Sequence, residues 1–313
     1  MRVFASIFHS PEFKSRWATL ILLLALPFAA HTAQAQSLGY EGPTGIFVTP
    51  LAYTSASPAN GLGKPSVSYH LLAGGPVIGD YSTVSVTEGF AKRFEFGFTE
   101  EIHAGSNQLP IDGVIEQPAY KLSQDFSILH GKATVLTNKA LGSIAVGGIY
   151  RFHDNNVYNG VPEGLTSSGA IFHQGTQNGD IYLVGTRVFT GIKKVPILLN
   201  AGLRGTDASL WGLGGNAPGF SARGFGALAF IFTLPNKSTL ILASEAAQQP
   251  QRVKLGLSQG LDIPTTVVYA ARFVPSPKHK LNIDVGVLHA SDGLQNPVLN
   301  AKDRFAFGLS YGF

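Results

Sequence analysis

The sequence predicts an all-β fold: a transmembrane, antiparallel, up-and-down β-barrel of about twelve strands, within a range of about ten to fourteen. Three observations carry this prediction. An export-type segment opens the chain, short alternating runs fill the rest, and no later apolar run approaches the ~20 residues of a membrane helix. Only 13% of residues are charged, against about 25% in soluble domains, and glycine is frequent, at 37 of 313 residues. Such a composition suits strands that face lipid on one side.

Residues 1–35 have the pattern of a cleaved signal peptide. A basic start precedes the apolar run Ala18–Ala30, and Ala33–Ala35 (AQA) supplies a small-x-small cleavage site. As a helix that run would span about 20 Å, too short to cross a bilayer. The alternative is an uncleaved anchor helix. We predict cleavage near Ala35 and export of the remainder.

Cysteine content and charge exclude other classes. The chain has no cysteine, so an exported fold cannot rest on disulfides. Removing residues 1–35 takes away three basic residues and one acidic residue, and the formal charge falls from +4 to +2. A nearly neutral chain without a concentrated basic patch gives no support for nucleic-acid binding.

Short runs with alternating faces begin after residue 65. In the run 93–99, three phenylalanines alternate with Arg93, Glu95 and Gly97, which predicts one apolar and one polar face. In the run 195–204, aliphatic residues alternate with Asn200, Gly202 and Arg204. The twelve predicted strands are 66–72, 81–90, 93–99, one within 121–136, 143–152, 180–189, 195–204, 222–233, 239–245, 265–273, 281–289 and 303–313.

The connections alternate in length. The short connections are 138–141, 190–194, 234–237 and 274–278, and the long ones are 105–118, 153–179, 205–221, 246–262 and 290–302. Short turns at one end and long loops at the other are typical of outer-membrane barrels, and a soluble sandwich, the alternative fold, shows no such alternation. A thirteenth strand at 253–257 would break the even count unless 45–51 formed a fourteenth.

The last strand, Asp303–Phe313, has one face of aromatic and aliphatic residues and one of small or polar residues. A C-terminal strand that ends in Phe resembles the assembly signal of bacterial outer-membrane β-barrels. The resemblance implies that Tyr311 and Phe313 guide assembly, with the barrel assembly machinery and outer-membrane lipid as partners, in the outer membrane of a Gram-negative-type bacterium.

The faces opposite the apolar ones contain the candidate functional residues. Charge on a lipid-facing strand surface near the midplane costs roughly 2–4 kcal/mol, so charged residues should face the lumen. The arginine excess would favour anionic or polyhydroxy solutes in a channel. Alternatively, Arg–carboxylate pairs would brace a closed, plugged barrel. For Arg187, both faces of the strand are apolar enough that the sequence leaves its direction undecided. The candidate lumen-lining residues are Arg93, Glu95, Arg151, Arg187, Arg204, Glu245, Arg272, Asp284 and Arg304.

Residues 36–65 form an irregular segment rich in Gly, Pro and Ser, ahead of a barrel at 66–313. Because many inward positions are small, this segment could occupy the lumen. Its GPTGIFVTP stretch, with the later GFAKRFEFG hairpin, resembles the start of outer-membrane barrels associated with exopolysaccharide operons. That resemblance implies polysaccharide secretion or surface-polymer handling, without naming residues for it.

Motifs for catalysis are weak. There is no HExxH pattern, no GxSxG elbow and no phosphate-binding loop, and we predict no cofactor, metal or catalytic residue. His153–Asn156 (HDNN) is the best candidate for a catalytic site, and the alternative is that these residues form a solvated loop tip. We expect a porin-like channel for small polar or anionic solutes, or an accessory in surface-polymer export. The alternatives are an outer-membrane lipid hydrolase and a plugged structural or adhesive barrel.

Overall fold

The computed structural model describes residues 37–74, 80–104, 125–138, 141–152, 177–190, 195–208, 220–249, 265–275, 280–290 and 303–313. The predicted signal peptide, His153–Asn156 and the possible strand at 253–257 lie outside these residues. The strands are β1 (Ser66–Ala73), β2 (Asp80–Phe90), β3 (Phe94–Ala104), β4 (Phe126–Asn138), β5 (Gly142–Phe152), β6 (Gln177–Phe189), β7 (Ile197–Thr206), β8 (Ser221–Thr233), β9 (Thr239–Ala247), β10 (Thr266–Val274), β11 (Leu281–Ala290) and β12 (Arg304–Gly312).

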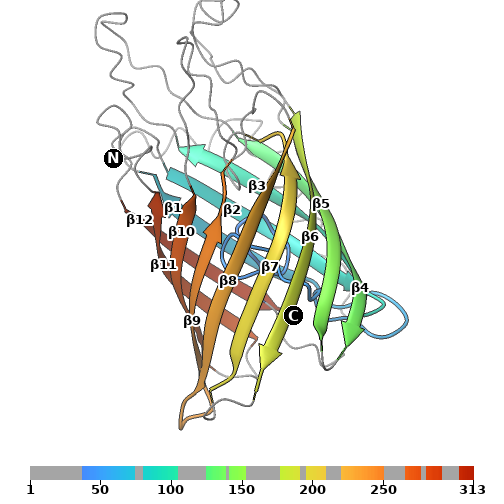
Figure 1. Cartoon of the computed structure of the whole chain (residues 1–313), viewed down its shortest axis with the longest axis vertical. Helices are drawn as coiled ribbons and strands as arrows, with labels where there is room; N and C mark the ends of the chain where they lie inside the picture. Colours follow the sequence, from blue (N-terminus) through green and yellow to red (C-terminus); the bar gives the residue numbers. More distant parts are fainter. Residues whose placement is uncertain are drawn as a thin grey trace, which may run out of the picture. The chain divides into compact units, whose positions relative to one another are not determined.

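The twelve strands form one closed antiparallel barrel (Figure 1). Every strand pairs with its neighbours in the chain, and β1 pairs with β12 to close the ring, with Ser68 opposite Ser310. Closure leaves no sheet edge, which satisfies the backbone in a medium without water. The predicted fold class and strand count are confirmed. In the described residues, no helix is long and apolar enough to cross a membrane.

The outer surface is apolar along most strands. The alternation predicted for β12 holds: Phe305, Leu309 and Tyr311 are exposed, whereas Ala306 and Ser310 are buried. Similar exposed side chains occur around the ring, on β3, β6, β8 and β11 among others. An even number of antiparallel strands with an apolar outer band is the architecture of bacterial outer-membrane barrels.

The inner surface is less polar than we expected. The prediction assumed that aliphatic and aromatic positions face outward, yet Ile128, Ile149, Tyr182 and Phe225 alternate inward and are buried. The reason is that the lumen is filled by protein, so an inward apolar side chain can be buried as well as an inward charge.

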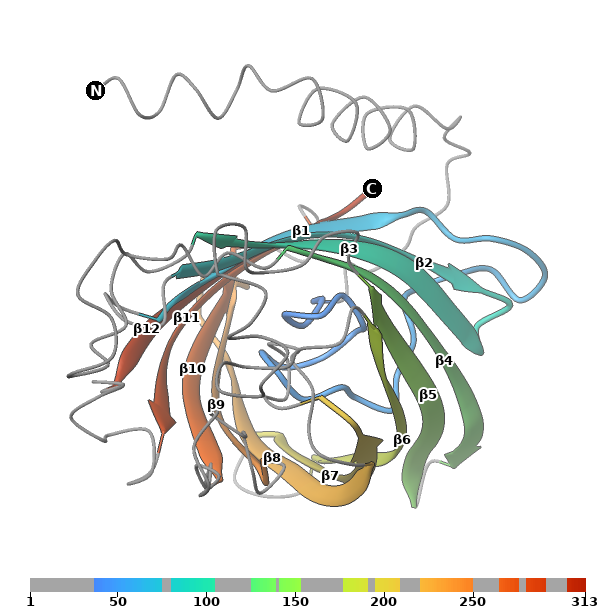
Figure 2. The same ribbon diagram turned by 90° about the horizontal axis from the view of Figure 1, so that it is seen from above.

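Residues 37–55 lie inside the ring of strands, as Figure 2 shows for the dark blue part of the segment. The residues from Ser37 to Leu51 are almost all buried. Residues 45–51 form no strand; the backbone instead folds on itself through isolated bridges, such as Gly45 with Pro50. We call residues 37–55 the plug. Residues 56–65 then lead along the end of β2, where Gly63 N donates to Gly89 O, into β1.

Candidate functional site

The plug folds into a tight double turn that its own backbone stabilises. Tyr40 N donates to Phe47 O at 2.7 Å, and Leu51 N donates to Thr44 O at 3.0 Å. Gly42 has a φ of 101°, which favours glycine. A Cβ at Gly42 would also lie 2.7 Å from His130 Nε2 on the wall, so the close approach excludes any larger residue without a shift. Many of the other polar groups of the plug bind the barrel wall.

Glu245 on β9 binds the tip of the plug. Its carboxylate accepts from the backbone N–H of Phe47 at 2.8 Å, of Val48 at 3.2 Å and of Thr49 at 2.6 Å, and from the Thr49 hydroxyl. Glu245 is completely buried. Successive N–H groups that converge on one anion form a nest, and charge-assisted hydrogen bonds of this kind are roughly twice as strong as neutral ones.

Glu95 on β3 and Lys132 on β4 hold the plug at Thr44. Glu95 accepts from Thr44 N at 2.8 Å, from Ser55 N at 2.6 Å and from the Thr44 hydroxyl. Lys132 Nζ lies 3.0 Å from Glu95 Oε1 and donates to Thr44 O, also at 3.0 Å. One ion pair therefore binds both the N–H and the C=O of the same plug residue, which fixes its orientation.

A second buried network joins the plug to β5, β6 and β7. Glu41 of the plug accepts from Arg151 Nε at 3.1 Å and from Arg204 Nη2 at 2.8 Å. Asp180 accepts from both guanidinium groups, at 2.5 Å from Arg151 Nη2 and 2.9 Å from Arg204 Nε, and Asn178 accepts from Arg151 Nη1 at 2.8 Å. Two cations and two anions give a network with no net charge, away from water.

Arg272 on β10 and Asp284 on β11 anchor the opposite side of the plug. Arg272 Nε donates to Asp284 Oδ1 at 2.6 Å, and its Nη2 donates to Ile46 O at 2.5 Å. The Ser37 hydroxyl donates to Asp284 Oδ2 at 3.4 Å. As with Glu95 and Lys132, an ion pair within the wall presents its unused hydrogen-bonding capacity to the plug.

Small polar side chains of the wall bind other plug carbonyls. Thr83 donates to Tyr40 O at 2.9 Å, Thr87 to Gly42 O at 2.8 Å and Asn200 Nδ2 to Pro50 O at 3.1 Å. Burial beside the Glu101 carboxyl raises the pKa of the Tyr40 phenol well above its ordinary value, so this residue stays neutral in the plug.

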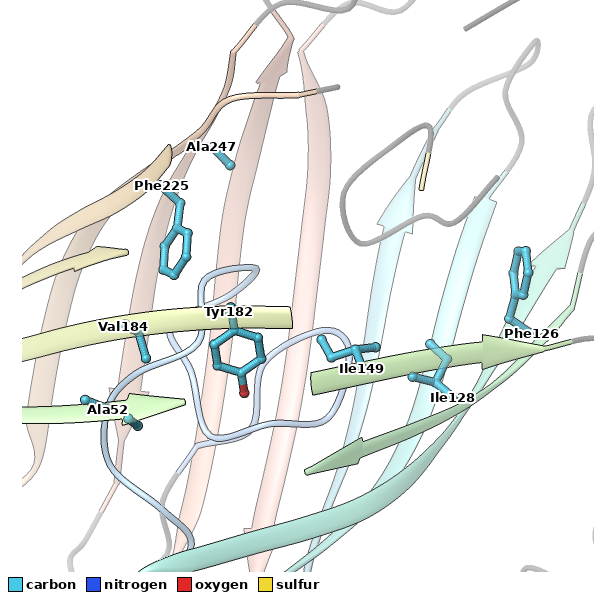
Figure 3. Packing of buried hydrophobic residues seen from close by; sticks show 9 residues of the cluster. Ala52, Phe126, Ile128, Ile149, Tyr182, Val184, Phe225 and Ala247 are labelled. Atoms are coloured by element: carbon cyan, nitrogen blue, oxygen red, sulfur yellow. The ribbon is translucent and has the colours of Figure 1, made fainter. Parts of the chain in front are cut away.

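Apolar packing accompanies these polar contacts. Three buried apolar clusters fill the lumen, and each combines plug and wall residues. Ala52 packs with Tyr182, Ile149 and their neighbours (Figure 3). Phe47 packs in the second cluster and meets His70 of β1 edge to face at 5.4 Å, and Ile46 and Leu51 belong to the third. Plug and wall side chains therefore pack together in all three clusters.

The structure places most predicted lumen-lining residues on the inner face. Glu95, Arg151, Arg204, Glu245 and Asp284 are buried there. Arg272 is half-buried, and Arg304 is half-buried on the inward-facing register of β12.

The prediction was wrong for two residues, which do not line the lumen. Arg93 is exposed in the turn between β2 and β3, because β3 begins at Phe94. Arg187 is exposed on the outer face of β6, with its guanidinium 4.3 Å from the centre of the Phe189 ring. Arg187 is close enough to the end of its strand to reach the membrane surface, so the cost of midplane burial does not apply to it.

Three site residues lie outside the predicted set. Glu41 precedes the predicted strands, and Lys132 and Asp180 lie on β4 and β6. The available signal is the cost of charge on a lipid-facing surface, which predicts an inward side chain for both Lys132 and Asp180. Tyr311 is exposed on the outer face and its ring packs edge to face with that of Phe313 at 5.1 Å. Their role in assembly stays a prediction.

Within the described residues, no group of three or more His, Asp or Glu side chains could hold a metal ion. No protein-family profile matches the chain, and no curated protein matches it. Two of the similar solved structures are autotransporter domains. The translocator domain of the autotransporter NalP from Neisseria meningitidis is 12% identical, covers 81% of this chain and 89% of its own, and has a TM-score of 0.39. The β domain of the Bordetella autotransporter Brka is 12% identical, covers 81% and 100%, and has a TM-score of 0.35.

Proposed function

We propose that this chain is an outer-membrane β-barrel whose lumen is closed in the resting state by its own plug. The observation that carries the proposal is the nest in which Glu245 accepts three successive plug N–H groups. A buried carboxylate is expensive unless it is fully hydrogen-bonded, and the plug supplies these bonds to Glu245. The apolar outer band supports the membrane location.

The charge pairing argues against an open, anion-selective pore. Arg151 and Arg204 share Glu41 and Asp180, and Arg272 pairs with Asp284, so their charge is neutralised within the lumen. An arginine held in this way offers little field to a passing solute. Of the expected functions, the plugged barrel is therefore favoured, and passage of polar solutes or of a surface polymer would require release of the plug.

Electrical recording in planar bilayers tests the closed state. The full mature chain should insert, show heat-modifiable gel migration and remain electrically silent at low voltage. Deletion of residues 38–55 should give steady conductance, because the wall then encloses water. A large, steady conductance from the unaltered chain would refute the closed state, and release of the protein in soluble form by osmotic shock would refute the membrane location.

The deletion variant also has a built-in check on folding. If it fails to migrate as a folded barrel, the variant Glu245→Gln in the full chain replaces it, since that change keeps the volume of the side chain. Brief openings of this variant support plug release, and silence indistinguishable from the unaltered chain contradicts it.

A further inference from the structure

The sequence segments that connect the strands fall into two groups of opposite charge. The five short turns, at residues 91–93, 139–141, 190–196, 234–238 and 275–280, contain eight Lys or Arg and no Asp or Glu. The five long connections at the other end, at residues 105–125, 153–176, 207–220, 248–265 and 291–303, contain nine Asp or Glu and four Lys or Arg. This asymmetry becomes visible only once the topology assigns each connection to an end.

Six described cations form what we call the short-turn rim. Lys92, Arg93, Arg187 and Lys237 are exposed, and Lys64 and Lys280 are half-exposed. They come from the entry to β1 and from turns or strand ends at β2–β3, β6, β8–β9 and β11, so they are spread around the ring. Within the described residues, none of the six pairs with an Asp or Glu side chain, although Lys280 Nζ donates to Phe313 O. A ring of like charges matches a surface that surrounds the barrel better than it matches one localised partner.

Three of the rim residues have an unusual backbone conformation. Lys92, Lys237 and Lys280 adopt φ values of 58°, 67° and 48°, in the left-handed region that favours glycine or asparagine. They make up three of the four non-glycine residues with positive φ in the described structure, and the fourth is Ala91, next to Lys92. The local backbone conformation therefore does not account for lysine at these turns.

Arg187 shows how the rim meets the apolar band. Its side chain is on the outer face of β6, and its guanidinium lies over the ring of Phe189, the last residue of that strand. An arginine with an apolar stem along the barrel and its head at a strand end is placed to reach the polar edge of a bilayer, and the ring contact orients it there.

The rim residues also repel one another. Burial lowers the pKa of Lys280 below its ordinary value, and the nearby Lys64 lowers it further. An anionic surface would relieve this repulsion. We infer that the short-turn rim binds the phosphate groups of anionic phospholipids in the bilayer leaflet at that end of the barrel. This inference rests on the membrane location proposed above.

Spin-labelled lipids test the inference directly. The full mature protein is refolded into phosphatidylcholine bilayers, with insertion checked first by heat-modifiable migration, and the association of spin-labelled phosphatidylglycerol is compared with that of spin-labelled phosphatidylcholine. We expect the protein to prefer phosphatidylglycerol by about threefold or more, and the preference to weaken in 1 M NaCl, where the screening length falls to about 3 Å.

Two variants distinguish charge from structure. Replacement of all six rim residues by Gln should remove the preference, and exchange of Lys64, Lys92, Lys237 and Lys280 for Arg should keep it. If the Gln variant does not insert, the pair Lys92→Gly and Lys237→Gly, which suits the backbone, should still insert and lower the preference. Equal association of the two lipids with the unaltered protein, or an undiminished preference in an inserted neutral variant, would overturn the inference. Failure of the unaltered protein to insert would instead overturn the proposed membrane location.

Discussion

Replacing Glu245 by Gln should release the tip of the plug while leaving the barrel intact. The two side chains have nearly the same shape, but a carboxamide has one accepting atom, and its NH₂ group would face backbone donors. In the native site one oxygen accepts from Phe47 N at 2.8 Å, and the other accepts from Thr49 N at 2.6 Å. The change therefore loses the charge-assisted character of every bond and leaves at least one buried N–H unpaired.

The cost follows from these contacts. Hydrogen bonds to charged groups contribute about 1.5–3 kcal/mol, and an unpaired buried donor costs about 1–3 kcal/mol. Allowing for relaxation of the turn, we expect the variant to weaken plug docking by about 2–4 kcal/mol. Because about 1.4 kcal/mol corresponds to a tenfold change, the open fraction should rise by roughly 30- to 700-fold.

Single-channel recording measures that fraction. Glu88→Gln is the matched control, because Glu88 alternates with the buried residues of β2 and faces outward, away from the plug. We expect frequent openings from Glu245→Gln and none beyond the unaltered level from Glu88→Gln. If both variants open no more often than the unaltered protein, the role assigned to Glu245 is refuted. If both variants open more often to the same extent, the effect comes from neutralising any carboxylate and not from the plug contact of Glu245.

Three further changes have defined outcomes. Gly42→Ala should speed proteolysis of the plug more than Gly61→Ala. Both glycines have positive φ, but no atom lies within 4 Å of a Cβ at position 61. Equal rates of proteolysis would contradict the close approach at Gly42. Arg151→Met should lower the free energy of unfolding by about 3–5 kcal/mol, because it leaves the two buried carboxylates Glu41 and Asp180 with the single cation Arg204. Adding Glu41→Gln should recover part of this loss, and an additive loss in the double variant would argue against the pairing. Phe47→Ala should cost about 3–5 kcal/mol of plug docking, seen as an increased open fraction, and a silent variant would contradict the packing of Phe47.

The fold was predictable because each strand has a local pattern of period two. The phenylalanines of β3 and the aromatic face of β12 both point outward, as alternation requires. Strand ends were less predictable: β3 continues to Ala104, where polar Glu100 and Glu101 replace the phenylalanines. Tertiary pairing with β2 extends the strand beyond its own pattern.

For the site, the sequence predicts only which strand face its charged residues occupy. Alternation identified Glu95, Arg151, Arg204, Glu245 and Asp284 as one set, because charge avoids the lipid face. It could not identify their partners, since these are backbone groups of the plug, far away in the chain. Nor could it place Arg187, because both faces of β6 carry apolar residues near it; the register of β6 puts Arg187 on the outer face, opposite Asp180 and Thr186.

Hydrogen exchange of the amide groups in residues 44–55 tests the central claim most directly. In the folded barrel the N–H groups of Thr44, Phe47, Thr49 and Ala52 donate to buried side chains of the wall. We predict that a peptide covering this stretch exchanges as slowly as peptides from the central strands of the same folded protein in detergent. Exchange of residues 44–55 at the rate of an unstructured peptide, with the strands still protected, would show that the segment does not occupy the lumen.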